Sequence, residues 1–194
     1  MSEVTDQKAS APSFKQASTA KELRQNRFGL ILFVTSQMVP YFMLINDRFV
    51  LADTYVSRRV DPLLGGFLPT LLLLLGVLPS WLAVRAIARN ALLQMQRQLQ
   101  LTGLLGVLAL IVMVWPMFSH RYDAISPFGE IHLVSLGLGG FFTLAALFVL
   151  GSVLLRATKG VIGPQHYFSV EASAWVWTFN AIAWLVLYIA VYFI

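Results

Sequence analysis

EASAWVWTFNAIAWLVLYIAVYFI, residues 171 to 194, has an acidic residue at its first position and no other charged residue. An α-helix needs about 20 mostly apolar residues to cross the hydrocarbon core of a bilayer, because each residue advances it by only about 1.5 Å. This stretch is long enough, and it lacks the charged face that a surface helix of a soluble protein keeps toward water. It therefore predicts a transmembrane helix.

The composition of the whole chain indicates an integral membrane protein. Of its 194 residues, 58% are apolar and 12% are charged, and the mean hydropathy is +0.73. Soluble proteins average about 25% charged residues. Cysteine is absent, which excludes disulfides, thiolate metal sites and cysteine nucleophiles. The net charge of +5 comes from basic residues dispersed among segment ends, so it does not predict binding to nucleic acid.

Four further apolar stretches match the last one in length. None of the five contains Asp, Glu, Lys or Arg, and all are longer than barrel strands, so we expect an all-α, polytopic membrane bundle of five transmembrane helices. The predicted spans are Phe28 to Asn46, Leu63 to Val84, Leu99 to Ser119, Ile131 to Leu155 and Ala172 to Ile194.

The residues before the first span form a separate region. Met1 to Ala17 are rich in Ser, Ala, Lys and Gln, which predicts a disordered tail. Thr19 and Glu22 have the spacing of a capping box, so we expect Ala20 to Arg27 to form a short surface helix. The predicted organisation is a disordered and interfacial tail, residues 1–27, followed by the bundle, residues 28–194.

Lys and Arg in the loops set the expected orientation, because in short loops these residues concentrate on the cytoplasmic side. Ten fall on one side and four on the other, so we expect a cytoplasmic N-terminus and, with an odd number of spans, a C-terminus at the outer face. The ten are Lys8, Lys15, Lys21, Arg24, Arg27, Arg85, Arg89, Arg97, Arg156 and Lys159. The four are Arg48, Arg58, Arg59 and Arg121, and the first three share a loop with Asp47, Asp53 and Asp61.

Aromatic and polar residues of the last span follow one helical face. Trp177 and Trp184 are seven residues apart, and Asn180 and Tyr188 continue the stripe at helical spacing. Such stripes usually pack against neighbouring helices, so we expect this face to be buried. Trp175 and Tyr192 are expected near the two membrane interfaces.

Polar side chains are few within the predicted spans. We expect Gln37 and Asn180 to form hydrogen bonds between helices. Glu171 is expected in the first turn of the last helix, where the helix dipole favours an acid. Small residues at Gly106, Ser135 and Gly139 predict close helix packing.

The histidines do not form a predicted site. His166 falls on the expected cytoplasmic side, whereas His120 and His132 fall near the other face, where we expect them to be hydrogen-bonded to loop groups. A membrane haem needs two histidines at a common depth, and a metal hydrolase needs histidines and carboxylates together. We therefore predict no catalytic, cofactor or metal site in this chain.

Two other functions remain open from the residues alone. A small transporter or channel would need a polar pathway, and Pro40 and Pro79 would permit the broken helices typical of transporters. However, no charged residue lies within a predicted span, and such residues usually mark pathways. A membrane enzyme acting on lipid would need reactive groups that converge at one interface.

The last span resembles the closing helix of cytochrome c oxidase subunit III. That family typically places a Glu six residues before a Trp-His-Phe, another Trp two before it, a Trp-Leu seven after it and a Tyr eight beyond that. Seven residues occupy these offsets here: Glu171, Trp175, Trp177, Phe179, Trp184, Leu185 and Tyr192. His166 is similar to the histidine that precedes the family's Glu.

The resemblance extends to other spans. Phe28 to Gln37 is similar to the family's Gly-x-x-Leu-Phe-x-x-Ser-Glu helix, with Ser36 matching and Gln37 in place of the glutamate. Thr178 and Ala181 stand where the family has a His and an Asp. Because an amide cannot carry a proton as a carboxylate does, the resemblance implies no proton-related role for Gln37.

The resemblance implies an accessory, non-catalytic subunit of a haem-copper terminal oxidase, of a short five-helix type found in the bacterial plasma membrane. Such a subunit supports the catalytic subunit structurally, shelters proton uptake during oxygen reduction and holds phospholipids in a cleft. Haem and copper are then expected in partner subunits I and II. The residues implied in packing or in the lipid cleft are Ser36, Gln37, His166, Glu171, Trp175, Trp177, Phe179, Trp184 and Tyr192.

Overall fold

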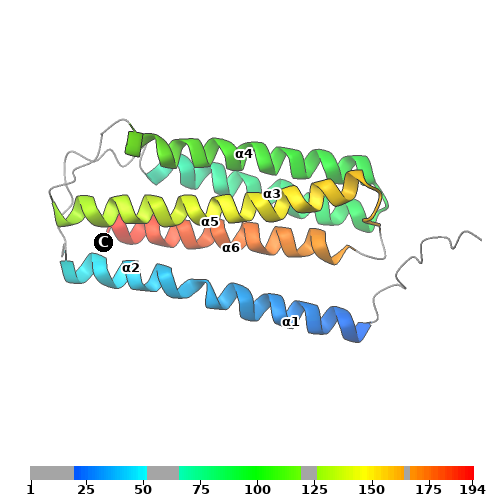
Figure 1. Ribbon diagram of the computed structural model, residues 1–194, viewed down its shortest axis with the longest axis horizontal. Coiled ribbons are helices and arrows are strands. Elements are labelled where there is room, and N and C mark those ends of the chain that lie inside the picture. The colour runs from blue at the N-terminus through cyan, green and yellow to red at the C-terminus, as the bar shows by residue number, and fades with distance from the viewer. Residues whose placement is uncertain (1–19, 52–65, 119–125, 164–166) are drawn as a thin grey trace, which may run out of the picture.

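A computed structural model describes residues 20–51, 66–118, 126–163 and 167–194, which are almost entirely helical (Figure 1). This confirms the all-α prediction. Within the described residues, five helical segments are long and apolar enough to cross a membrane, as predicted; the first, Lys21–Leu51, joins α1 and α2. The helices are α1 (Ala20–Ser36), α2 (Met38–Leu51), α3 (Leu68–Ala88), α4 (Leu92–Phe118), α5 (Pro127–Thr158) and α6 (Phe168–Tyr192).

The region before the first predicted span is described only in part. Residues 20–27 are helical, as expected, and they continue without interruption into that span as part of α1. The predicted disordered segment, Thr19 of the capping box, His120 and His166 lie outside the described residues.

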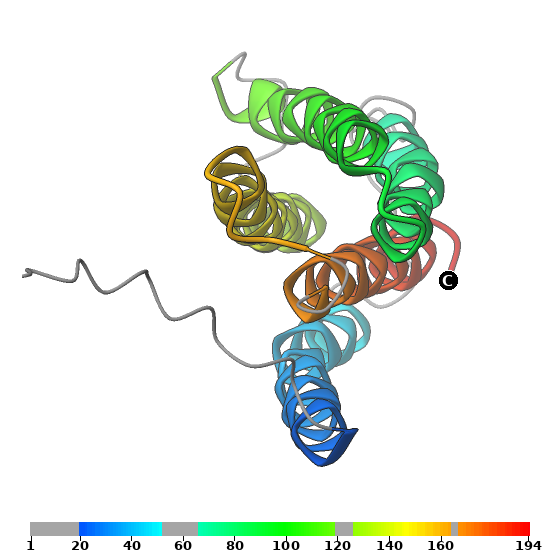
Figure 2. The same cartoon turned by 90° about the vertical axis from the view of Figure 1, so that its right-hand side faces the viewer.

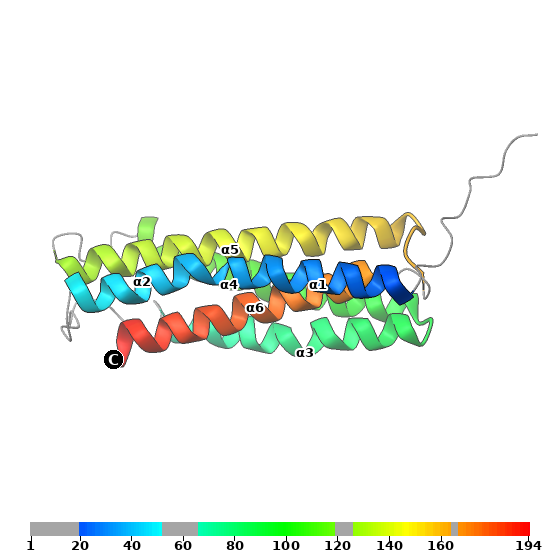
Figure 3. The ribbon, with the colours of Figure 1, turned by 90° about the horizontal axis from the view of Figure 1, so that it is seen from below.

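Helices α3 to α6 form a closed ring of neighbours, in which α3 and α5 each contact both α4 and α6 (Figure 2). The α1–α2 segment lies outside this ring and runs along the seam between α5 and α6 (Figure 3). Helix α6 contacts α1, α2, α3 and α5, and half of its apolar stretch is buried, against 11% for α1–α2. The last helix is therefore the centre of the packing.

The first span is divided at Gln37. Pro40 has no backbone N–H to donate to the Ser36 carbonyl, and its ring crowds that carbonyl, so the helix cannot continue regularly. The Gln37 N–H is shared between the carbonyls of Phe33 at 3.3 Å and Val34 at 3.2 Å. The break that Pro40 permits is therefore present.

The break changes how the first span packs. Every described side chain of α1 is at least partly exposed. In contrast, α2 buries Tyr41, Leu44 and Arg48 against the ring. The segment thus holds to the ring mainly through its second half.

Glycines of three neighbouring helices receive the indole rings of α6. A side chain at Gly76 of α3 or Gly106 of α4 would collide with the Trp177 ring, and one at Gly139 of α5 would collide with the Trp184 ring. Glycine at these positions lets the backbones approach closely, which confirms the packing role predicted for Gly106 and Gly139.

We predict that Gly139→Ala lowers the unfolding temperature of the chain, because the added methyl group overlaps the Trp184 ring and overpacking costs about 1–3 kcal/mol. Gly151→Ala is the matched control on the same helix, since a Cβ there has nothing within 4 Å. It should be neutral or stabilising, because alanine favours a helix over glycine by about 1 kcal/mol. Near-UV circular dichroism melts in detergent test this, and equal melting of the two variants would contradict it.

Candidate functional site

The predicted stripe of α6 is buried. Trp177 and Asn180 are each 1% exposed, Trp184 is 2% exposed and Tyr188 is 8% exposed, which confirms that this face is turned toward other helices. The Trp177 indole N–H donates to the Leu73 carbonyl of α3 at 3.2 Å. The stripe thus joins helices by hydrogen bonding as well as by packing.

A second indole hydrogen bond between α3 and α6 was not predicted from the sequence. The Trp81 Nε1 donates to the Thr178 Oγ1 at 3.0 Å, and the Trp81 and Trp175 rings meet edge to face with centroids 5.7 Å apart. Thr178 stands where the family resemblance places a histidine. Its hydroxyl takes part in helix packing, which a comparison of motif letters alone does not reveal.

Asn180 forms the hydrogen bond between helices that was expected of it. Its Nδ2 donates to the Thr143 Oγ1 of α5 at 3.1 Å. The Thr143 hydroxyl in turn lies 3.9 Å from the Met113 sulfur of α4, a weak acceptor. A short polar chain therefore crosses from α6 through α5 to α4.

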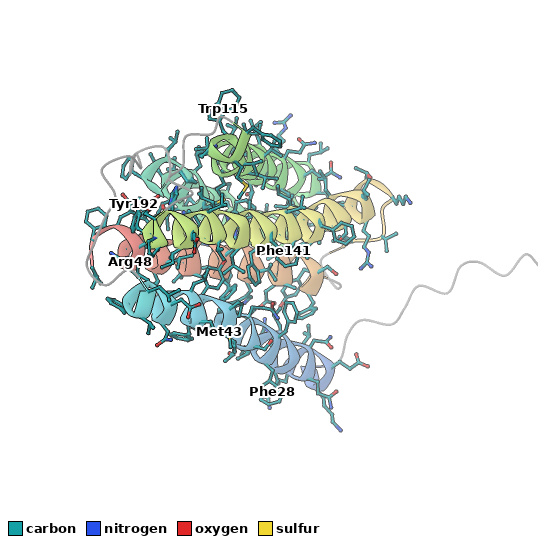
Figure 4. The ribbon with its side chains drawn as sticks, turned by 60° about the vertical axis from the view of Figure 1, so that its left-hand side comes forward. Phe28, Met43, Arg48, Trp115, Phe141 and Tyr192 are labelled. Carbon is teal, nitrogen blue, oxygen red and sulfur yellow. The ribbon has the colours of Figure 1, made fainter. Side chains whose placement is uncertain are left out.

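A cavity of about 220 Å³ lies where the break in α1–α2 faces α5 and α6. Its walls are mainly apolar and aromatic, and Figure 4 shows Phe141 on the side of α5 that faces α2. Gln37 and Asn180 contribute the amide groups. The lining residues are Phe33, Val34, Gln37, Phe141, Phe142, Ala145, Val149, Val176, Phe179 and Asn180.

The hydrogen bond of the Gln37 side chain is local. Its Nε2 donates to the Ser36 Oγ at 3.1 Å, and that hydroxyl donates to the Phe33 carbonyl at 2.7 Å. The bond between helices that was expected for Gln37 is therefore not the one observed. The amide nitrogen therefore finds an acceptor within its own segment, on the neighbouring residue.

Glu171 lies in the first turn of α6, as predicted, and forms an ion pair with Arg27 of α1. The Arg27 Nε lies 3.0 Å from Oε1 of Glu171, and Nη2 donates to Oε2 at 3.0 Å. The two side chains are 48% and 11% exposed, respectively, so the carboxylate is much the more buried partner. This bidentate pair joins the middle of α1 to the start of α6.

At the opposite end of the bundle, Arg48 and His132 differ from what the sequence predicted; Figure 4 labels Arg48 and Tyr192 there. Arg48 was expected in a loop, but α2 continues past the predicted end of the span and buries it completely. Its Nε donates to the Val191 carbonyl at 3.3 Å, and its guanidinium carbon lies 5.3 Å from the centre of the Phe128 ring. These contacts replace water around the charge.

His132, the second residue of the predicted span that begins at Ile131, was expected to be hydrogen-bonded to loop groups near the membrane interface. It is 2% exposed, and its Nδ1 lies 2.7 Å from the Tyr192 hydroxyl of α6, so its observed partner belongs to a helix and not to a loop. Helix α5 begins at Pro127, after the cap formed by Ser126, which places His132 one turn inside the helix. Tyr192 of α6 thereby gains an unpredicted partner on α5.

Metal ligands do not gather in the part of the chain that the structure describes: no three His, Asp or Glu side chains there form a group suited to an ion. The candidate residues are instead distributed along the bundle. Glu171 lies at one end, Gln37 and Phe179 lie at the central cavity, and Tyr192 lies at the other end. This arrangement provides packing surfaces, an ion pair and hydrogen bonds between helices, and a mainly apolar cavity.

Comparison with known proteins matches residues 9–194 to the family model described as cytochrome c oxidase subunit III. The chain is 32% identical over 179 residues to cytochrome c oxidase subunit 3 of Pisaster ochraceus, covering 86% of this chain and 68% of that protein. It is 31% identical over 184 residues to the same subunit of Gallus gallus, with the same coverage. For Paracentrotus lividus the identity is 28% over 195 residues, covering 93% and 74%.

We predict that Arg27→Ala destabilises the chain more than Glu171→Gln. Removing Arg27 leaves a largely buried carboxylate unpaired, at about 1–3 kcal/mol, whereas Arg27 without its partner can still reach water, at under about 1 kcal/mol. Arg24→Ala, at an exposed position of the same helix, is the control.

Unfolding temperatures in detergent at low and high salt measure the difference. The double variant Arg27→Ala with Glu171→Gln should melt near the Glu171→Gln variant, because the unpaired charge is then removed. A loss for Arg27→Ala no greater than for Arg24→Ala would show that the ion pair does not fasten α1.

Proposed function

Because the chain belongs to the cytochrome c oxidase subunit III family, we propose that it is the accessory subunit III of a bacterial haem-copper terminal oxidase. The match over residues 9–194 supports this proposal most strongly. The chain associates with an oxidase complex, and we place haem and copper in partner subunits I and II. Its own role is then to support the catalytic subunit and to shelter proton uptake during oxygen reduction.

The contacts of the polar residues favour a supporting role. Glu171 is held by Arg27, and Trp177 and Asn180 bond to neighbouring helices. Each of these groups is engaged in joining one helix to another. None of them is presented at the cavity together with the acid–base partner that proton-transfer catalysis requires.

We place phospholipid at the cavity beside α1. The mainly apolar walls suit the end of an acyl chain, and the cavity lies about halfway along α6, at the depth that acyl chains reach. Gln37 and Phe179, two of the residues implied by the resemblance, line it. The amide of Gln37 stays neutral, so an apolar ligand need not displace a charge.

The expected membrane is the bacterial plasma membrane, with the start of α1 on the cytoplasmic side. The distribution of Lys and Arg supports this orientation, because basic loop residues are retained in the cytoplasm. Arg85, in the last turn of α3, and Lys159, directly after α5, agree with it. We infer that the ion pair of Arg27 and Glu171 then lies at the cytoplasmic end.

Removing this chain from the native oxidase tests the proposed function. We predict that the initial rate of oxygen consumption remains substantial, because haem and copper lie in other subunits, but that activity declines faster over repeated turnover. The measurement is oxygen uptake by the purified complex, with the reintroduced wild-type chain as control. A chain that purifies without a haem-bearing partner and moves a solute across liposomes would contradict the proposal.

A separate prediction concerns the lipid. Ala145→Trp should fill the cavity and reduce the phospholipid retained by the purified complex by about one molecule per chain, because the indole occupies the space of an acyl segment. Leu144→Trp is the matched control, because Leu144 precedes Ala145 on the same helix, is exposed and does not line the cavity. Native mass spectrometry counts the lipid molecules per chain. Equal lipid counts in both variants would show that the cavity does not hold phospholipid.

A further inference from the structure

The turn between α3 and α4 places three arginines at one end of the bundle. Arg85 lies in the last turn of α3, Arg89 caps that helix, and Arg97 lies in the second turn of α4. All three side chains are exposed, and none of them forms a salt bridge or a hydrogen bond within the residues that the structure describes. The sequence has no Asp or Glu from residue 66 to residue 118, so these two helices offer the arginines no counter-ion.

Arg85 continues the outward-facing side of α3. Leu71 and Leu78 are 40% and 68% exposed, and Leu71, Leu78 and Arg85 follow one another at intervals of seven residues. Residues at this interval lie on nearly the same face of an α-helix, because two turns take about 7.2 residues. Arg89, four residues further on, extends the face to the end of the helix. The apolar outer face of α3 therefore ends in two cations.

Helix α4 repeats this pattern. Arg97, Leu104 and Ile111 are also seven residues apart, and the two apolar side chains are 57% and 54% exposed. Because α3 and α4 are antiparallel neighbours, the cationic ends of their outer faces lie at the same end of the bundle (Figure 1). Each helix thus presents an apolar outer face that is followed by positive charge at this end.

The outer faces suit lipid better than another helix. Contacts between membrane helices are enriched in small residues, which let two backbones approach closely. The glycines Gly76 of α3 and Gly106 of α4 face the Trp177 ring of α6, whereas the outer faces carry leucine and isoleucine. In a bilayer these bulky side chains meet acyl chains. The long arginine side chains beyond them then reach the headgroups.

The guanidinium group favours a phosphate as its partner at this depth. Its planar N–H donors match two phosphate oxygens at once, and its charge persists over the whole physiological pH range. Phosphatidylcholine carries a quaternary amine that offsets the charge of its own phosphate. Anionic phospholipids keep a net negative charge, which attracts basic side chains to the membrane surface. Three cations without an acidic residue on their own helices therefore complement an anionic phospholipid.

We propose that the end of the α3–α4 hairpin, defined by Arg85, Arg89 and Arg97, is a surface that binds the headgroups of anionic phospholipids in the leaflet around it. The surface is separate from the cavity, which lies among α1, α5 and α6. It rests on the membrane-spanning fold and on the charges of the hairpin, and it does not depend on the proposed function of the chain.

Titration of the full chain in detergent with phosphatidylglycerol, and separately with phosphatidylcholine of identical acyl chains, tests the surface. Native mass spectrometry gives the Kd of the first bound lipid. Because the two lipids share their acyl chains, any binding in the apolar cavity contributes equally to both, and the ratio of the two constants reports the headgroup. We expect the unsubstituted chain to bind phosphatidylglycerol more tightly, and equal constants would overturn the proposal.

Substitution of the hairpin arginines should remove this preference. Arg85→Gln, Arg89→Gln and Arg97→Gln are each expected to weaken phosphatidylglycerol binding about fivefold, the effect of one basic residue near an anionic surface, and to leave phosphatidylcholine binding nearly unchanged. The matched control combines Lys21→Gln, Arg24→Gln and Lys159→Gln, which remove three exposed charges at the same end of the bundle but outside the hairpin. The control should keep the preference.

Two further variants keep the outcome decisive. Replacing the three arginines by lysine preserves the charge and should retain part of the preference. Ala145→Trp fills the cavity and should leave the preference intact, so a failure of the cavity to hold lipid is distinguishable from a failure of the hairpin to select it. A preference that survives the three glutamine substitutions together, or that the charge-matched control loses equally, would contradict the assignment to the hairpin.

Discussion

The two buried indoles of α6 constrain the positions of three neighbouring helices. Trp177 fills the space against α3 and α4, and Trp184 fills the space against α5, where each ring lies over a glycine. In a bilayer, lipid tails are as apolar as leucine, so burial alone does not favour contact between helices. Close fit and the hydrogen bond from Trp177 to Leu73 supply the preference. The closed ring of α3 to α6 depends on this fit.

The α1–α2 segment is attached to the ring in a different way. It contributes no indole to the ring, and few of its residues are buried. Polar contacts hold it on both sides of the break at Gln37: Arg27 of α1 pairs with Glu171, and Arg48 of α2 donates to the Val191 carbonyl. Between them lies the break at Gln37, where the cavity opens. The segment therefore lies over the α5–α6 seam, with a polar contact on each side of the cavity.

The sequence was sufficient for features that follow from local rules. Five apolar stretches predict five spans, and the spacing of Trp177, Asn180 and Trp184 predicts the buried face of α6. Pro40 and Pro79 both permit a break, but α3 continues through Pro79, so the sequence did not show which of the two would interrupt its helix. Pairings between distant residues have no local signal. Arg27 and Glu171 are separated by 144 positions, and either alone is an ordinary charge at a helix end.

Arg48 shows a second limit of sequence reasoning. Counting apolar residues ends a span at the first charge, but a helix continues as long as its backbone is hydrogen-bonded and its side chains find partners. The Val191 carbonyl and the Phe128 ring accommodate the guanidinium, and both come from segments far along the chain. For the same reason the partner of His132, the Tyr192 hydroxyl of α6, could not be predicted from the sequence.

Gln37 presents an uncharged amide, rather than a carboxylate, at the cavity. A carboxylate in a mainly apolar cavity would have to be neutralised by protonation or by a nearby cation, since burying an isolated charge is very costly. The cations described near the α1–α2 segment lie toward its ends, where Arg27 already pairs with Glu171 and Arg48 already contacts Val191 and Phe128. An amide avoids this requirement at any pH, and the local bond to Ser36 satisfies its donor. The centre of the cavity can then remain neutral, which suits an apolar ligand better than it suits the movement of protons.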